Sequence, residues 1–122
     1  YYNAHSFSDG TLRFISLAAL LLQPEKNLPS VILLDEPELG LHPYAISVLA
    51  EMLRFASMKT QIIISTQSVT LVNQFEPGDL IIVDRENESS VFKRPAPDTV
   101  ETWLEDYALG DLWEKNLMGG RP

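Results

Sequence analysis

Residues 31–43 read Val-Ile-Leu-Leu-Asp-Glu-Pro-Glu-Leu-Gly-Leu-His-Pro, and this stretch decides the fold. Its first four residues are apolar without polar alternation, which predicts a strand buried on both faces, as in a parallel sheet. Pro37 ends the strand because it has no N–H to donate to the ladder. We therefore expect Asp35 and Glu36 at the carboxyl end of a central strand, where open α/β sheets bind their ligands.

Two adjacent carboxylates at such a position suit nucleotide hydrolysis. Asp35 would hold Mg²⁺ through water, and Glu36 would position or deprotonate the attacking water. A strand end with two solvated acids is the alternative interpretation. These residues alone leave the two interpretations balanced, so the neighbouring segments have to decide between them.

The composition narrows the classes of function. The 122 residues amount to one domain or part of one. The net charge of −8 is spread along the chain, so the sequence offers no basic stripe for nucleic acid. The absence of cysteine excludes disulfides and thiolate metal sites, and two distant histidines argue against zinc. No apolar run is long enough to span a bilayer, so we expect a cytoplasmic protein that binds no membrane.

The apolar spacing predicts that helices and strands alternate. Helices are expected at residues 11–22, 45–56, 69–75 and 100–117, and strands at 31–34, 61–67, 80–84 and 91–94, with a hairpin turn at 87–90. The first helix is apolar at most positions, which predicts that it is largely buried. The alternation predicts an α/β fold: a mainly parallel sheet with flanking helices, a C-terminal edge hairpin and a last helix.

Three polar clusters lie where these elements begin or end. Residues 8–11, Ser-Asp-Gly-Thr, stand at a helix start, where free N–H groups and the helix dipole favour a phosphate. An ordinary N-cap is the commoner reason for such residues. Asp35 and Glu36 form the second cluster. Residues 65–68, Ser-Thr-Gln-Ser, follow the next strand, where the Gln67 amide could reach a γ-phosphate or water, although a polar turn with a helix cap is the commoner reason.

Taken together, these clusters resemble a known family. A helix-capping serine, a strand ending in Asp-Glu-Pro and a second strand ending in Ser-Thr look like the C-terminal half of an ABC-type ATPase head. The motif Asp-Glu-Pro-Glu-x-Gly-Leu-His-Pro is typical of the RecF/SMC-like ATPases and their OLD relatives, which act on DNA or in phage defence. The resemblance covers residues 5–85 and implies a P-loop NTPase-like fold.

The resemblance also implies roles for individual residues. Asp35 would bind Mg²⁺ and Glu36 would be the catalytic base of a Walker B motif, while Gln67 stands where the switch histidine usually lies. ATP would be sandwiched between two heads of a homodimer. The residues implied to contact ATP across that dimer are Ser8, Asp9, Gly10 and Thr11, and those implied to form the D-loop at its interface are Gly40, Leu41 and His42.

The sequence departs from the family pattern at three points. Asp9 replaces the usual first glycine of the signature motif and brings a negative charge near a phosphate. Gln67 can donate a hydrogen bond but cannot act as a cation. The pattern Gly-x-x-x-x-Gly-Lys-Ser/Thr, which would cradle the β- and γ-phosphates, does not occur. We therefore expect residues 1–122 to be the C-terminal part of one ATPase domain, active in the complete protein and inactive alone.

Two other classes of function compete with this one. A non-catalytic interaction or regulatory module on the same fold agrees with Asp9 and with the missing P-loop, but it leaves Asp35 and Glu36 unexplained. A Mg²⁺-dependent nuclease of the Toprim kind has only residues 84–86, Asp-Arg-Glu, as a loose match. DNA repair, phage defence and a toxin–antitoxin-like role all remain open, with DNA bound through other parts of the protein. Uncovered strand edges and apolar faces predict that the fragment self-associates.

Overall fold

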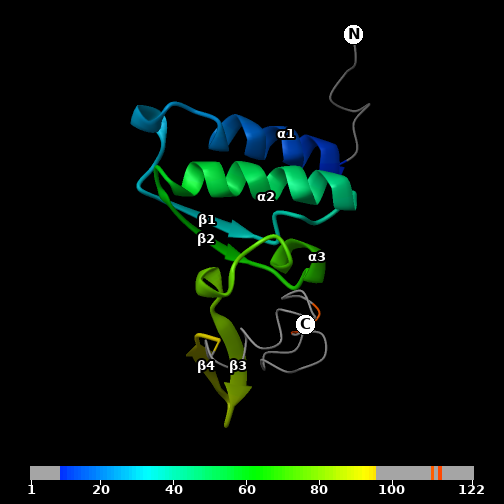
Figure 1. The fold of residues 1–122 in the computed structure, drawn as a ribbon, viewed down its shortest axis with the longest axis vertical. Helices are drawn as coiled ribbons and strands as arrows, with labels where there is room; N and C mark the ends of the chain where they lie inside the picture. The colour runs from blue at the N-terminus through cyan, green and yellow to red at the C-terminus, as the bar shows by residue number, and fades with distance from the viewer. Residues whose placement is uncertain (1–8, 96–110, 112, 114–122) are drawn as a thin grey trace. The chain divides into compact units, whose positions relative to one another are not determined.

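The computed structural model describes residues 9–95, 111 and 113, which fall into two compact units, residues 1–66 and 67–122. Each unit is described by itself. The elements of the first unit are α1 (Asp9–Leu21), a 3₁₀ turn (Glu25–Asn27), β1 (Val31–Asp35), α2 (Pro43–Ser57) and β2 (Gln61–Ser65) (Figure 1).

The strands β1 and β2 form a parallel pair. The pairing runs in register from Val31 opposite Gln61 to Asp35 opposite Ser65. Because the strands are parallel and in register, both end at the same edge of the sheet. The parallel sheet and the position of the two acids at the end of β1 confirm the sequence prediction.

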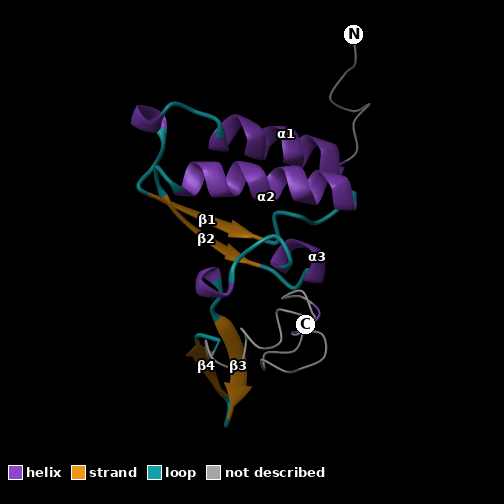
Figure 2. Cartoon of the chain, viewed as in Figure 1, coloured by secondary structure: helices purple, strands orange, loops and turns teal. Residues whose placement is uncertain are grey.

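Helix α2 connects the two strands. Pro43 occupies its first turn, where the missing N–H costs no hydrogen bond. Its apolar residues recur at helical spacing and face inward; the buried ones are Ile46, Leu49, Ala50, Leu53 and Ala56. Helix α1 packs along α2, and α2 packs against β2 (Figure 2). Leu21, Leu49 and Leu53 are fully buried in this core, and each contributes about 1.5–3 kcal/mol of burial free energy.

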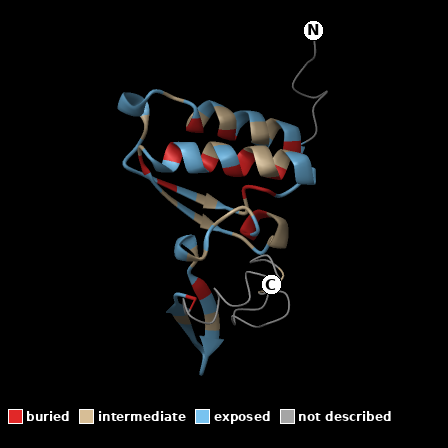
Figure 3. Cartoon of the chain, in the orientation of Figure 1, coloured by how far each residue is buried: buried red, intermediate tan, exposed pale blue. Residues whose placement is uncertain are grey.

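Both helices lie on one face of the β1–β2 pair, and this overturns two predictions. The strand β1 is not buried on both faces of the first unit: Ile32 is buried, whereas Leu33 is 72% exposed. Successive strand side chains point to opposite faces, so the residues facing away from the helices are uncovered. Likewise α1 is not largely buried, because only its α2-facing side is covered and Ile15 is exposed (Figure 3).

The second unit contains α3 (Val69–Val72), a 3₁₀ turn (Pro77–Asp79), β3 (Ile82–Glu86) and β4 (Ser89–Lys93). Within the residues that the structure describes, β3 and β4 pair only with each other, as an antiparallel hairpin. The hairpin confirms the predicted reversal of the chain, but its turn consists of Asn87 and Glu88, and β4 begins at Ser89 rather than at residue 91. Arg94 fixes its base, because Nη1 donates to the carbonyl oxygens of Gly78 at 2.8 Å and Leu80 at 3.2 Å.

Most element boundaries differ from the prediction by one to three residues, and three examples follow. The strand β2 ends at Ser65 rather than at residue 67. Helix α3 ends at Val72 rather than at residue 75, because Asn73 already caps it. The strand β3 begins at Ile82 rather than at residue 80, because the Leu80 N–H still donates to Pro77 of the preceding turn. The helix predicted at 100–117 lies outside the described residues apart from Asp111 and Trp113.

In the part of the chain that is described, no helix is long and apolar enough to cross a membrane.

Candidate functional site at the end of β1

The carboxylate of Asp35 is tied to the neighbouring strand. Ser65 Oγ donates a hydrogen bond of 2.5 Å to Asp35 Oδ1, and the N–H of Glu36 donates to the Ser65 carbonyl oxygen at 2.8 Å. A side-chain bond and a backbone bond therefore join the same two strand ends. Together they fix the direction in which the first acid leaves the sheet.

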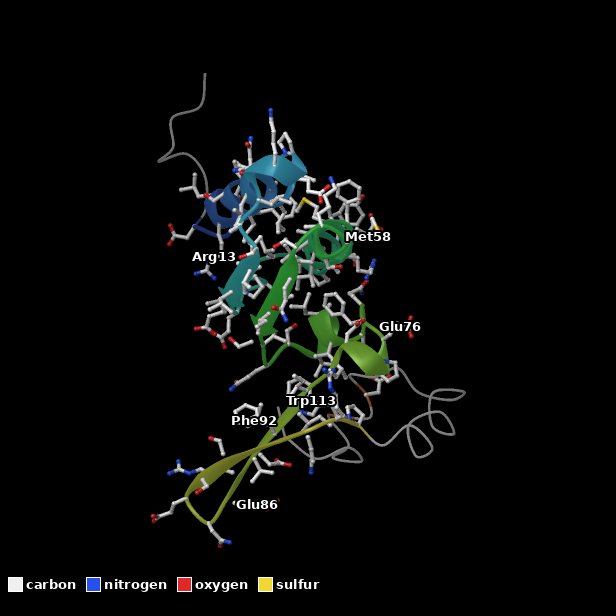
Figure 4. All side chains as sticks on the ribbon, turned by 90° about the vertical axis from the view of Figure 1, so that its left-hand side faces the viewer. Arg13, Met58, Glu76, Glu86, Phe92 and Trp113 are labelled. Atoms are coloured by element: carbon white, nitrogen blue, oxygen red, sulfur yellow. The ribbon has the colours of Figure 1, made fainter. Side chains whose placement is uncertain are left out.

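Glu36 has an unusual backbone conformation. Its φ of +46° lies in the left-handed region, which costs a non-glycine residue about 1–2 kcal/mol. Its carbonyl oxygen accepts hydrogen bonds from the Leu39 N–H at 3.2 Å and from Arg13 Nη1 at 3.2 Å; Arg13 is labelled in Figure 4. These bonds hold the strained residue. Strain of this kind is concentrated at functional sites.

The loop after Glu36 meets the start of α1. Gly40 has a φ of +80° and packs on the backbone of Gly10. A Cβ atom on Gly10 would lie 2.9 Å from the carbonyl carbon of Gly40 and closer still to its oxygen, so the contact requires glycine. The structure therefore brings the predicted signature motif and the predicted D-loop together within one chain, which sequence reasoning did not foresee.

The remaining predicted residues of these motifs are placed as follows. Asp9 and Thr11 lie in the exposed first turn of α1, where backbone N–H groups have no intrahelical partner. Ser8 lies outside the described residues. Leu41 is half-buried. His42 is the N-cap of α2, since its Nδ1 accepts a hydrogen bond from the Tyr44 N–H at 3.3 Å. This local role is additional to the interface role that the resemblance implies.

Glu38 is a functional candidate that sequence reasoning missed. Its side chain is only 8% exposed, and Oε1 accepts a hydrogen bond of 2.5 Å from Thr66 Oγ1. The only sign of it in the sequence was a third acid within the same motif as Asp35 and Glu36. Thr66 directly precedes Gln67, the first residue of the second unit. Ser68 caps α3 by accepting from the Leu71 N–H at 3.2 Å, as the helix-cap interpretation of this cluster expects.

The oxygen atoms at the end of β1 suit Mg²⁺. The ion prefers oxygen ligands and is commonly held by one or two carboxylates together with waters and substrate phosphates. Asp35 is exposed, and the Ser65 bond occupies one oxygen of a carboxylate that has about four acceptor positions. Over residues 9–95, 111 and 113, no three acidic or histidine side chains converge to enclose a metal by themselves.

Residues 84–86, the loose match to the Toprim pattern, lie in the hairpin, where Asp84 has a structural role. Asp84 Oδ2 lies 3.0 Å from Lys93 Nζ, and the side chains of the pair are 27% and 44% exposed. An ion pair at this exposure contributes little stability. It nevertheless gives Asp84 a cross-strand role that needs no metal.

The fold and the geometry at the end of β1 define part of an AAA/ABC-type ATPase head. The family model that matches residues 2–73 is described as "AAA domain, putative AbiEii toxin, Type IV TA system". Since this match spans more than half of the 122 residues, the chain belongs to that family of AAA domains. The resemblance seen in the sequence is thereby confirmed.

Two known proteins are similar to this chain. The Old nuclease of Escherichia phage P2 is 29% identical over an alignment of 104 residues, which covers 78% of this chain and 18% of the phage protein. A structure described as "Structural biochemistry of ATP-driven dimerization and DNA stimulated activation of SMC ATPases" matches with a TM-score of 0.64 and 17% identity, covering 84% of this chain and 62% of that one. This second likeness confirms the P-loop NTPase-like fold. The chain spans less than two thirds of either relative.

Proposed function

We propose that the complete protein binds and hydrolyses ATP, and that this chain supplies the acids that act on metal and water. One observation carries the proposal: Asp35 and Glu36 are fixed side by side at the end of a parallel strand, the second of them in a strained conformation. Membership of the AAA family supports the same conclusion.

The roles of the side chains follow from their chemistry. Mg²⁺, when bound through water at Asp35, would neutralise charge on the phosphates. Glu36 accepts a proton from the attacking water or orients it, and the Gln67 amide donates a hydrogen bond toward that water or the γ-phosphate. The protein's contribution to phosphoryl transfer is mainly positioning and electrostatic stabilisation, so the bonds that hold Asp35 and Glu36 matter as much as the acids.

The proposed active form is a homodimer in which two heads enclose ATP. Residues 8–11 contact the nucleotide held by the second copy, and Gly40, Leu41 and His42 contribute to the interface. The contact of Gly10 with Gly40 supports this arrangement, because one region of a single head carries both motifs. The SMC ATPase structure of similar fold is itself described in terms of ATP-driven dimerization. The process served is proposed to be DNA repair or phage defence in the cytoplasm, with DNA bound elsewhere in the protein.

The test is ATP hydrolysis by the full-length protein, with Glu36→Gln beside the wild type. The variant should bind ATP and lose turnover by about 100-fold or more, because general-base catalysis contributes at least that much. Glu51→Gln, which removes an exposed carboxylate from α2, is the matched control and should keep wild-type turnover. Unchanged hydrolysis in Glu36→Gln would show that Glu36 is not the base.

A non-catalytic module is the second candidate function. Asp9 favours it, because an exposed carboxylate in the first turn of α1 repels a phosphate approaching that helix end. The same experiment decides between the two. If the full-length wild type binds no ATP, the regulatory or interaction module becomes the better interpretation, and Asp35 and Glu36 need another explanation.

A further inference from the structure

We propose that Glu38 is a positioning residue for ATP hydrolysis, which holds the segment after β2 against the loop after β1. This inference rests on the ATPase function proposed above. Glu38 would not touch the nucleotide or the water. It would act through Thr66, whose hydroxyl it binds.

The buried position of Glu38 does not favour a carboxylate on packing grounds. The residue is 8% exposed, and Oε2 is fully buried with no hydrogen-bond donor among the described residues. Burying a carboxylate with one oxygen unpaired costs stability, whereas an apolar side chain of similar size would avoid that cost. Among the residues that the structure describes, the bond made by the other oxygen is what gives a carboxylate at this position a role.

That bond has the geometry of a strong link. Thr66 Oγ1 lies 2.5 Å from Glu38 Oε1, within the range of charge-assisted O–H···O⁻ bonds. It joins segments 28 positions apart in sequence. The bond is shielded from water by the burial of Glu38, so solvent competes with it weakly.

A second link lies directly beside the first, at the ends of the two strands. Ser65 Oγ, in the last residue of β2, binds Asp35 in the last residue of β1, and the next hydroxyl, Thr66 Oγ1, binds Glu38. The first link orients the proposed metal-binding acid. The second fixes Thr66, from which the backbone continues directly into Gln67. Loosening Thr66 should misplace Gln67 and slow hydrolysis, while ATP affinity, to which Glu38 contributes no contact, should stay the same.

Two substitutions of similar side-chain size test the positioning role of Glu38 in the full-length protein. Thr66→Val removes the donor and Glu38→Met removes the acceptor. Each should lower kcat about tenfold or more while the Kd for ATP stays within about twofold, since tenfold in rate corresponds to a modest change in barrier. The double variant should be no slower than the slower single variant, because all three lose the same bond. Thr66→Ser keeps the hydroxyl and should restore turnover.

The outcomes separate this inference from the proposed function. Wild-type kcat in Thr66→Val overturns the positioning role, and so does a parallel loss of kcat and ATP affinity, which marks general structural damage. If Glu38→Met does not fold, the comparison of Thr66→Val with Thr66→Ser still decides. Glu36→Gln is measured beside them: if it loses hydrolysis while the Thr66 and Glu38 variants do not, only this inference fails. Hydrolysis that persists in Glu36→Gln overturns the proposed function and this inference with it.

Discussion

Gly10 and Gly40 allow two backbone segments to approach closely, a role that the sequence alone does not reveal. The resemblance assigns Gly10 to a motif that contacts a phosphate and Gly40 to a loop that contacts the second copy. In the structure the two glycines approach each other, and the lack of a Cβ on Gly10 lets the backbone of Gly40 come near. Sequence reasoning can place a glycine within a motif, but only the tertiary fold shows which backbone it has to admit.

A substitution at Gly10 should therefore cost stability. Gly10→Ala places a methyl group against backbone that cannot move aside freely, and we expect a loss of about 1–3 kcal/mol in the free energy of unfolding. Gly78→Ala is the control, because its added Cβ would meet no atom within 4 Å. Urea unfolding of both variants measures the difference. Equal stability of the two would mean that the start of α1 moves away from the loop at little cost.

At the scale of elements, the sequence predicted what local chemistry determines. The strands β1 and β2 and the helix α2 were predicted correctly, because apolar spacing and Pro43 determine secondary structure over a few neighbouring residues. The exposed face of β1 was not foreseen, because a run of four apolar residues does not say which faces other segments cover. The buried position of Glu38 escaped prediction for the same reason: it depends on Thr66, in a distant segment.

The hairpin β3–β4 carries strain that a substitution can relieve. Asn87 and Glu88 both have positive φ, at 49° and 65°, as a two-residue turn with the twist of a hairpin requires. Glycine adopts this conformation without steric cost, so Glu88→Gly should stabilise the hairpin by roughly 0.5–1 kcal/mol. Hydrogen exchange of the β3 and β4 amides in the full-length protein should become slower. Ser90→Gly, at an exposed strand position, should have the opposite effect, and faster exchange in Glu88→Gly would contradict the argument.

At the scale of the whole molecule, the first unit has an apolar face that its own helices do not cover. Val31, Leu33 and Ile63 are 43%, 72% and 51% exposed on the side of the β1–β2 pair that faces away from α1 and α2. The chain spans 18% of the phage relative and 62% of the SMC structure, so the longer proteins contain further polypeptide beyond the region matched here. We propose that such polypeptide covers this face in the complete protein.

Residues 1–122 expressed alone should consequently self-associate through the uncovered face. Light scattering over a range of concentrations should give a mass above that of one chain, and Leu33→Lys should lower it, because a charge resists burial in the contact. Ile15→Lys, on the exposed side of α1, is the matched control and should change the mass less. A monomeric mass at high concentration would contradict this prediction and show that the apolar face can remain exposed to water.

The way α2 connects β1 to β2 has a consequence for the order in which the protein forms. The strand pair, the helix that covers it and the hydrogen bonds at Asp35 and Glu38 all lie between residues 31 and 66. Closing this short segment costs little chain entropy compared with joining distant parts of the sequence. Contacts between nearby residues also form fastest. We therefore expect this contiguous segment to bring the acidic end of β1 together by itself, and Arg13 of α1 to add its hydrogen bond to the Glu36 carbonyl oxygen from outside it.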